Sequence, residues 1–127
     1  MREKILKILD NEATVKASIE TLKKLLEIES SDDFKLLFKT LNILVDEAYI
    51  IENNSHEYSL IKNTDYIVGQ LDLKERGFGF VIDRDRNIDD VFIRKDDVNG
   101  AMNLDVVLVY VSKYRKGARA EGEIKKV

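Results

Sequence analysis

Glycine and phenylalanine alternate in residues 76–82, which read Arg-Gly-Phe-Gly-Phe-Val-Ile, and a second β-prone run, Asp-Val-Phe-Ile, follows at 90–93. Alternate side chains of a strand point to one face, so Phe78 and Phe80 share a face of a predicted strand. Phe92 on the following strand can stand beside them. The spacing predicts a flat aromatic platform of the kind on which single-stranded nucleic-acid bases stack.

The alternative is that these phenylalanines belong to the core of a β-sheet, where aromatic residues are common. Gly77 and Gly79 favour the surface interpretation. Glycine is a poor residue for a strand interior, but it is useful where a ligand or another backbone approaches closely.

The second half of the chain has no helical period, and turn residues divide its short apolar runs. Five strands in this length predict an OB-type β-barrel, whose second and third strands form the usual nucleic-acid face. The aromatic platform falls on those two strands. We predict strands at 66–73, 77–83, 90–94, 104–111 and 121–127, with loops at 83–89, 96–103 and 112–120.

The first half shows three apolar stripes at helical spacing, followed by two β-prone runs. Ser18 is the predicted N-cap of the second helix, and Ser30 or Ser31 that of the third. The β-prone runs at 49–52 and 57–61 bracket the turn-rich residues 53–56, which predicts a hairpin. The stripes are Ile5, Ile8 and Leu9; Ile19, Leu22, Leu25 and Leu26; and Phe34, Leu37, Phe38, Leu41, Leu44, Val45 and Ala48.

Three helices and a hairpin are the outline of a winged helix-turn-helix. We therefore expect an α+β chain of two domains, a winged helix at residues 1–62 and a five-stranded OB-fold at 66–127. The predicted domain boundary at residues 63–65 contains neither proline nor a Gly/Ser run, so we expect a short linker between the two domains.

Composition excludes several functional classes. The chain has 127 residues, no cysteine and one histidine, which rules out disulfides, cysteine-based zinc sites and thiol nucleophiles. No apolar run approaches the roughly 20 residues needed to cross a bilayer. Charged residues interrupt the first apolar stretch, which is not the pattern of a secretory leader. We expect a soluble cytoplasmic protein.

Charge differs between the two halves. Residues 1–65 carry 9 Lys or Arg against 13 Asp or Glu, whereas residues 66–127 carry 12 against 11. The last fifteen residues are the most basic, and they can either neutralise phosphates or form a solvated face. The basic residues there are Lys113, Arg115, Lys116, Arg119, Lys125 and Lys126.

The runs at 77–81 and 90–93 resemble the two RNA-binding motifs of cold-shock domains. Residues 97–109, Asp-Val-Asn-Gly-Ala-Met-Asn-Leu-Asp-Val-Val-Leu-Val, resemble the segment that follows these motifs in the ribonuclease R family of 3′ to 5′ exoribonucleases. The shorter lead at 69–77 lacks the tryptophan of free-standing cold-shock proteins, and Arg94 replaces the histidine usual after the second motif. The shorter spacing favours the ribonuclease R family. Both departures remove stacking groups, and Arg94 can stack or pair with phosphate instead.

The resemblance covers essentially the whole chain, because that family begins with a winged helix and a first cold-shock domain. It implies a non-catalytic N-terminal region that captures single-stranded RNA. In that family the magnesium-dependent chemistry lies in a separate central domain, so we expect no catalytic site and no cofactor here, and a chain cut after the first cold-shock domain. Turn preference accounts for Asp83, Asp85, Asp89, Asp90, Asp96 and Asp97 better than metal binding does.

The expected mechanism is stacking of bases on Phe78, Phe80 and Phe92, with cations meeting the RNA backbone. The predicted cationic contacts are Lys74, Arg76, Arg94 and Lys95.

The predicted winged helix is less suited to nucleic acid. Its third helix opens with Asp32 and Asp33, and its hairpin adds Glu52 and Glu57 without Lys or Arg, so duplex DNA would be repelled. A protein contact or a spacer role is favoured for this half, and His56 receives no role. Two competing hypotheses stay open, a DNA-binding winged-helix regulator and a protein-interaction module.

Overall fold

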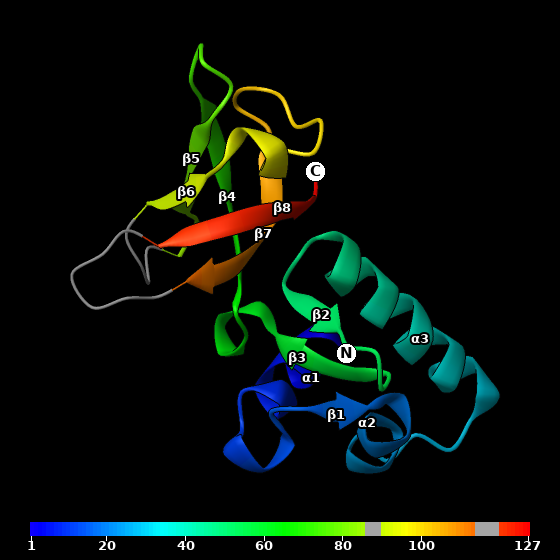
Figure 1. The fold of residues 1–127 in the computed structure, drawn as a ribbon. Helices are drawn as coiled ribbons and strands as arrows, with labels where there is room; N and C mark the ends of the chain where they lie inside the picture. The colour runs from blue at the N-terminus through cyan, green and yellow to red at the C-terminus, as the bar shows by residue number, and fades with distance from the viewer. Residues whose placement is uncertain (86–89, 114–119) are drawn as a thin grey trace. The chain divides into compact units, whose positions relative to one another are not determined.

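The chain folds into two compact units, residues 1–64 and residues 65–127 (Figure 1). The computed structural model describes residues 1–85, 90–113 and 120–127, without the side chain of Lys113. Each unit has its own cluster of buried apolar side chains. Within the described ranges, no helix is both long and apolar enough to cross a membrane.

Three α-helices form most of the first unit: α1 at Arg2–Leu9, α2 at Ile19–Leu25 and α3 at Ser31–Asp46 (Figure 1). The Ser18 side chain accepts a hydrogen bond from the Thr21 N–H and caps α2. Of the two candidate caps for α3, Ser30 is the one used, since its Oγ accepts from the Asp33 N–H at 3.1 Å. A 3₁₀ turn, η1 at Glu12–Thr14, follows α1 and was not predicted.

The predicted stripes supply the core of this unit, with two corrections. Phe38 is 53% exposed and Leu25 is 49% exposed, although both were assigned to buried faces. On α3 the buried face is set by Leu37, Leu41 and Leu44, and Phe38 lies about 100° further round the helix than Leu37. The buried side chains include Ile5, Leu9, Leu22, Leu37, Leu41, Leu44, Ile50 and Tyr58.

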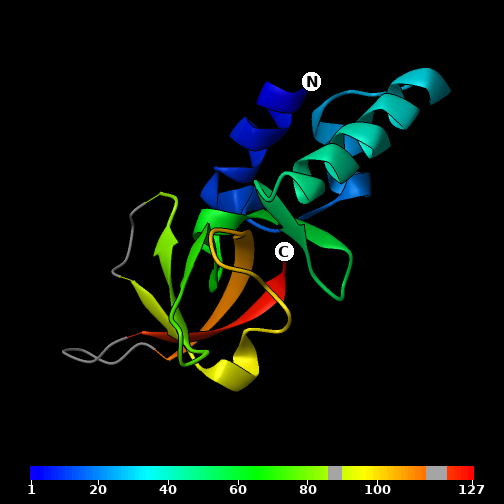
Figure 2. The same cartoon turned by 90° about the horizontal axis from the view of Figure 1, so that it is seen from above.

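A three-stranded antiparallel sheet completes the first unit, in the order β1-β3-β2. The predicted hairpin is confirmed as β2, Ile50–Glu52, and β3, Glu57–Leu60, and Figure 2 shows α3 running beside it. The strand β1 comprises only Ala17–Ser18 and is too short to leave an alternating pattern in the sequence.

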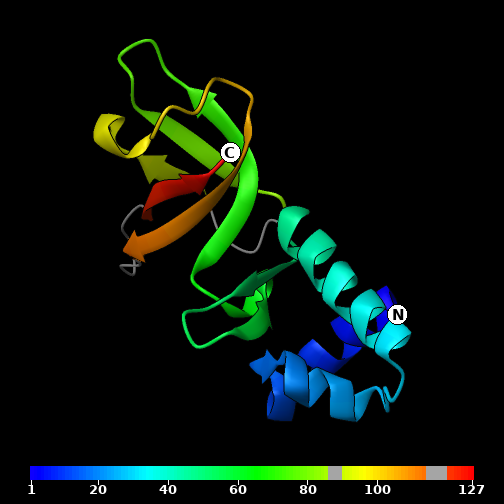
Figure 3. The ribbon, with the colours of Figure 1, turned by 90° about the vertical axis from the view of Figure 1, so that its right-hand side faces the viewer.

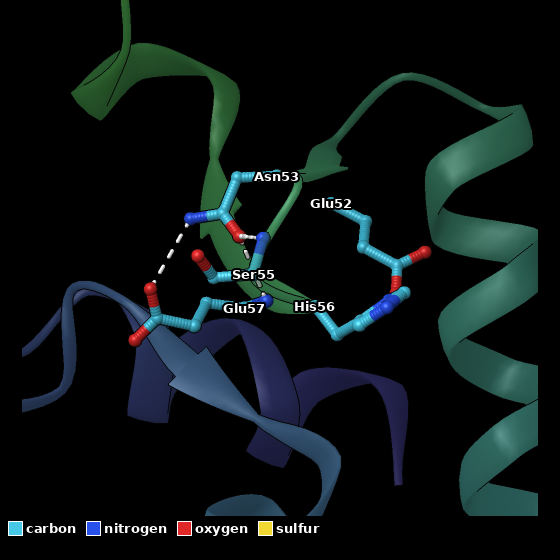
Figure 4. Close-up of polar contacts among 5 residues, drawn as sticks. All are labelled: Glu52, Asn53, Ser55, His56 and Glu57. Atoms are coloured by element: carbon cyan, nitrogen blue, oxygen red, sulfur yellow. Dashed lines mark hydrogen bonds and ion pairs between the residues drawn. The ribbon is translucent and has the colours of Figure 1, made fainter.

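The turn of this hairpin is held by its own side chains (Figure 4). The Asn53 Oδ1 accepts hydrogen bonds from the N–H groups of Ser55 and Glu57, at 2.9 and 3.0 Å. Its amide nitrogen donates to the Glu57 carboxylate at 3.2 Å, and the His56 ring nitrogen Nδ1 lies 3.2 Å from a Glu52 carboxylate oxygen. His56 therefore belongs to a turn made of polar contacts within the hairpin.

The second unit is a closed barrel in the order β4-β5-β6-β8-β7. All five predicted strands are present, with ends that differ by a few residues, and they confirm the OB-type barrel. The long strand β4 pairs with both β5 and β7 (Figure 3), and the turn η3, Lys95–Asp97, occupies the start of a predicted loop. The strands are β4, Tyr66–Leu73; β5, Gly79–Asp83; β6, Val91–Ile93; β7, Val106–Lys113; and β8, Glu121–Lys126.

Alternation along these strands separates core from surface. Leu71, Val81, Val91, Ile93 and Val109 are fully buried in the barrel interior. Residues one position away on the same strands therefore point outward.

Candidate nucleic-acid interface

The three phenylalanines lie together on the outer face of the barrel. Phe80 on β5 stands directly opposite Phe92 on β6, and its neighbour Val81 points into the core. Phe78 precedes β5 by one residue and joins them. All three side chains are partly exposed, which is the placement that the alternation of residues 76–82 predicts.

Their rings contact one another in a triangle, here named the aromatic cluster (Phe78, Phe80 and Phe92). Ring centroids are 6.0 Å apart for Phe78 and Phe80, 5.8 Å for Phe78 and Phe92, and 5.6 Å for Phe80 and Phe92. The interplanar angles of 84°, 50° and 54° correct the expectation of a flat platform. Neighbouring aromatic rings prefer edge-to-face contact because of their quadrupoles, so the cluster offers both ring edges and ring faces.

The two glycines serve the backbone around this cluster. Gly77 has φ +97° and ends the three-residue loop 75–77, across which the Lys74 N–H donates to the Phe78 carbonyl at 2.8 Å. Gly79 is buried, and a Cβ there would lie 2.9 Å from the Asp72 carbonyl oxygen on β4. The close approach that requires Gly79 is thus to the backbone of the neighbouring strand, one of the two alternatives that the sequence left open.

Two of the predicted cations flank the aromatic cluster in ion pairs. The Lys74 Nζ lies 6.0 Å from the centre of the Phe80 ring and 2.9 Å from the Asp72 carboxylate. On the opposite side, the Arg94 guanidinium lies 3.4 Å from the Glu121 carboxylate, and Glu121 is the residue paired with Phe92. Sequence reasoning missed both carboxylates. Asp72 lies two positions before Lys74, a local i, i+2 signal, whereas only strand pairing brings Glu121 beside Arg94.

The other two predicted cations are not held by carboxylates of the described residues. Arg76 is exposed in the loop that precedes Phe78. The Lys95 side chain packs against Gly77, where an added Cβ would lie 3.0 Å from its methylenes. Neither forms an ion pair within residues 1–85, 90–113 and 120–127, which leaves both charges available to an anionic ligand.

Other candidate residues lie elsewhere. Arg115, Lys116, Arg119 and Asp89 fall outside the described residues. At the chain's end, the Lys125 Nζ lies 2.6 Å from a Glu123 carboxylate oxygen on the same strand. Among the described aspartates, Asp83 is buried and its Oδ1 accepts from the Asp85 N–H, the turn role expected of it.

Among described residues, no group of three or more His, Asp or Glu side chains is placed to hold a metal ion.

The outer face of the barrel also carries apolar side chains that the sequence did not single out. Ile82, the next outward residue of β5 after Phe80, is 49% exposed, and Val106 on β7 is 60% exposed. Both are paired with Gln70 of β4, so the three residues form one row across three strands. The i, i+2 spacing could have identified Ile82, but no local signal identifies Val106.

The first unit presents a different surface. Its hairpin turn displays Glu52 and Glu57 with no Lys or Arg (Figure 4), and Asp32 and Asp33 are exposed at the start of α3. Leu36 and Ile43 are 48% and 40% exposed on one flank of α3, and Phe38 lies on the other. This surface combines carboxylates with exposed apolar groups.

Residues 69–127 match the family described as Ribonuclease B OB domain. The match begins within β4 and runs through the rest of the barrel, so it includes the aromatic cluster and all four flanking cations. It supports the OB-fold of the second unit and does not extend to the first. A comparison with curated proteins found no match.

Proposed function

We propose that this chain is the RNA-binding N-terminal region of a ribonuclease R-like 3′ to 5′ exoribonuclease. Its barrel would capture single-stranded RNA on the aromatic cluster, and its first unit would be a winged helix-turn-helix. The observation that carries the proposal is the aromatic cluster on the outer face of β5 and β6, in a barrel similar to the ribonuclease B OB domain.

The contacts suit a flexible single strand. Bases have π-faces that stack on partly exposed aromatic rings whatever their sequence, and each such contact is worth about 1–3 kcal/mol. Arg76 and Lys95 meet phosphates directly. Lys74 and Arg94 must first break their ion pairs with Asp72 and Glu121. Breaking them costs little free energy, because an exposed ion pair contributes only about 0–1 kcal/mol.

The first test is a titration of fluorescein-labelled twelve-nucleotide RNA, with duplex DNA of the same length as the comparison. We expect saturable binding of the RNA and weaker binding of the duplex, whose bases are stacked on one another. Equal or tighter binding of duplex DNA would favour a DNA-binding regulator and contradict the proposal.

A second test concerns catalysis. We propose that the chain captures RNA without cleaving it, and that Mg²⁺ chemistry belongs to a catalytic domain of the ribonuclease R kind. A labelled single-stranded RNA with a free 3′ end should stay intact in Mg²⁺ or Mn²⁺. Cleavage that copurifies with the protein and is abolished by Asp90→Asn would contradict this part of the proposal.

A protein-contact role for the first unit is the second candidate. It is favoured by the exposed apolar residues Leu36, Phe38 and Ile43 beside an acidic hairpin. Replacing all three with Ser should abolish capture of a protein partner and leave RNA affinity unchanged. A loss of RNA affinity instead would place RNA contacts in the first unit.

A further inference from the structure

The barrel carries a second aromatic pair on its outer face, away from the aromatic cluster. Tyr66 at the start of β4 stands directly opposite Tyr110 on β7, with ring centroids 5.4 Å apart and an interplanar angle of 62°. Their neighbours Ile67, Val109 and Val111 are buried in the core, so both tyrosines face outward. Tyr110 is 37% exposed.

A cation lies beside this pair. The Lys125 Nζ lies 2.6 Å from a Glu123 carboxylate oxygen, and Glu123 stands directly opposite Tyr110 on the neighbouring strand. The hydrogen bond to Glu123 raises the pKa of the Lys125 ammonium. Lys125 is therefore charged at neutral pH, and its ion-pair partner Glu123 stands beside Tyr110. Its ion pair with Glu123 is exposed and contributes little to stability, so the ammonium can exchange the carboxylate for a phosphate.

An exposed route on the same face joins the two aromatic sites. From Phe80 it continues to Ile82, crosses Gln70 to Val106, and then follows β7 through Leu108 to Tyr110. Crossing the three strands covers about 10 Å, and four residues of β7 add about 14 Å. The side chains between Phe80 and Tyr110 on this route carry no carboxylate, whereas Asp72 stands opposite Phe80 and Glu123 opposite Tyr110, each in an ion pair with a lysine.

We propose that Tyr66, Tyr110 and Lys125 form a second subsite for single-stranded RNA, at which a base stacks on Tyr110 and Lys125 meets the adjoining phosphate. Aromatic rings beside a cation on an open sheet face are the recurring means of holding single strands without sequence preference. The subsite rests on the proposed function, because it extends the path of the strand held by the aromatic cluster. The barrel would then bind one RNA strand at two sites, the aromatic cluster and this subsite.

The test is a titration of twelve-nucleotide oligouridylate with the full chain and four variants. Tyr110→Val removes the ring and keeps a β-prone residue, so affinity should fall about five- to twentyfold, the lower part of the range for a lost stacking contact. Tyr110→Phe keeps the ring and should stay within about twofold of the original affinity. Tyr49→Val is the matched control, because Tyr49 is an exposed tyrosine of the first unit.

The fourth variant, Phe92→Leu, distinguishes failure of the proposed function from failure of the second subsite. If the original chain binds no RNA, the proposed function and the subsite both fail. If Phe92→Leu weakens binding while Tyr110→Val behaves like Tyr49→Val, the subsite is overturned and the proposed function stands.

A spectroscopic measurement keeps the proposal falsifiable if Tyr110→Val does not fold. The chain contains five tyrosines and no tryptophan, so its fluorescence reports tyrosine alone. A base stacked on Tyr110 should quench that ring, and the RNA-dependent quenching should be smaller in Tyr110→Phe. Identical quenching in the two proteins would overturn the subsite.

Discussion

Two β-hairpins of the chain, β2–β3 in the first unit and β4–β5 in the second, differ in surface chemistry. The β2–β3 hairpin closes on a turn in which Asn53 hydrogen-bonds to Glu57 and the His56 ring lies beside the Glu52 carboxylate (Figure 4). Its only aromatic strand residue, Tyr58, is buried. The β4–β5 hairpin closes on Gly77 and displays Lys74 and Phe80 outward. The same supersecondary element thus serves as an acidic surface in one unit and an aromatic surface of mixed charge in the other.

The difference shows that strand pairing by itself does not define the candidate site. In the barrel, β5 also pairs with β6, which adds a third ring to the hairpin. The strand β8 pairs with β6 in turn, which adds the Arg94–Glu121 ion pair. In the first unit, the hairpin has only the two-residue β1 as a further partner. The candidate binding surface of the barrel therefore depends on what the neighbouring strands add to the hairpin.

The largest effect should come from disturbing the pairing of the barrel hairpin. A Cβ at Gly69 would lie 1.9 Å from the Ile82 carbonyl oxygen, so Gly69→Ala must force β4 and β5 apart. We expect a loss of at least about 4 kcal/mol in the free energy of unfolding of the barrel, measured by urea denaturation. The helical circular dichroism of the first unit should persist, because that unit has its own core.

Gly100→Ala is the control for this substitution. A Cβ at Gly100 meets no atom within 4 Å, and only its φ of +80° opposes alanine, at a cost of about 1–2 kcal/mol. Equal stability of the Gly69 and Gly100 variants would contradict the close strand approach.

The next effect concerns RNA affinity. Replacing Phe80 or Phe92 with Leu removes a stacking ring and should weaken binding of single-stranded RNA by about 1–3 kcal/mol, measured by fluorescence anisotropy. Phe38→Leu removes a half-exposed ring from the first unit and should change nothing. Equal losses from all three variants would remove the distinction between the two surfaces.

Stability of the same variants distinguishes a surface cluster from a core. The ring contacts of Phe80 and Phe92 are worth about 0.5–1.5 kcal/mol beyond their buried area, so the loss on unfolding should be modest. Leu71→Ala, in the barrel interior, should cost about 2–5 kcal/mol. Losses as large as that of Leu71→Ala, with normal RNA affinity, would make the phenylalanines core residues.

A smaller effect should appear in the salt dependence of RNA binding. Contacts from two to four of the flanking cations give a log–log slope of about −1.4 to −2.8, at roughly 0.7 per phosphate on a single strand. Arg76→Gln or Lys95→Gln should each reduce the slope by about 0.7, whereas Lys62→Gln in the first unit should not. A flat salt response in the original chain would mean that these cations are only solvated surface.

The smallest effect should be on the pH dependence of the first unit. The hydrogen bond from Arg2 lowers the pKa of the Glu47 carboxyl below its ordinary value of about 4.3. A lowered pKa adds stability above the ordinary value, and this stability is lost as pH falls through the folded-state pKa. Urea midpoints for the original chain should therefore drop slightly more than those of Glu47→Gln between pH 5 and pH 3, without a change in RNA affinity at neutral pH. Identical midpoint shifts would mean that the pair adds nothing.

Local patterns determined most of the elements. The i, i+3 and i+4 spacing located α3, serine caps located the starts of α2 and α3, and alternation located the five barrel strands. Such signals lie within a few residues of one another, so they can be read from one sequence. The outward placement of Phe78, Phe80 and Phe92 is of the same kind, because it follows from the two-residue period of a strand.

Tertiary structure decided what distant segments meet. The tilt of the three rings, the placement of Glu121 beside Arg94, and the facing of Tyr66 and Tyr110 all depend on strand pairing in the barrel. The need for glycine at position 79 also comes from strand pairing, since the carbonyl oxygen that leaves no room for a Cβ there belongs to β4. Partners such as Phe80 and Phe92, Arg94 and Glu121, or Tyr66 and Tyr110 are distant in the sequence and are brought together by register. Register is set by packing of the whole barrel, not by any local run of residues.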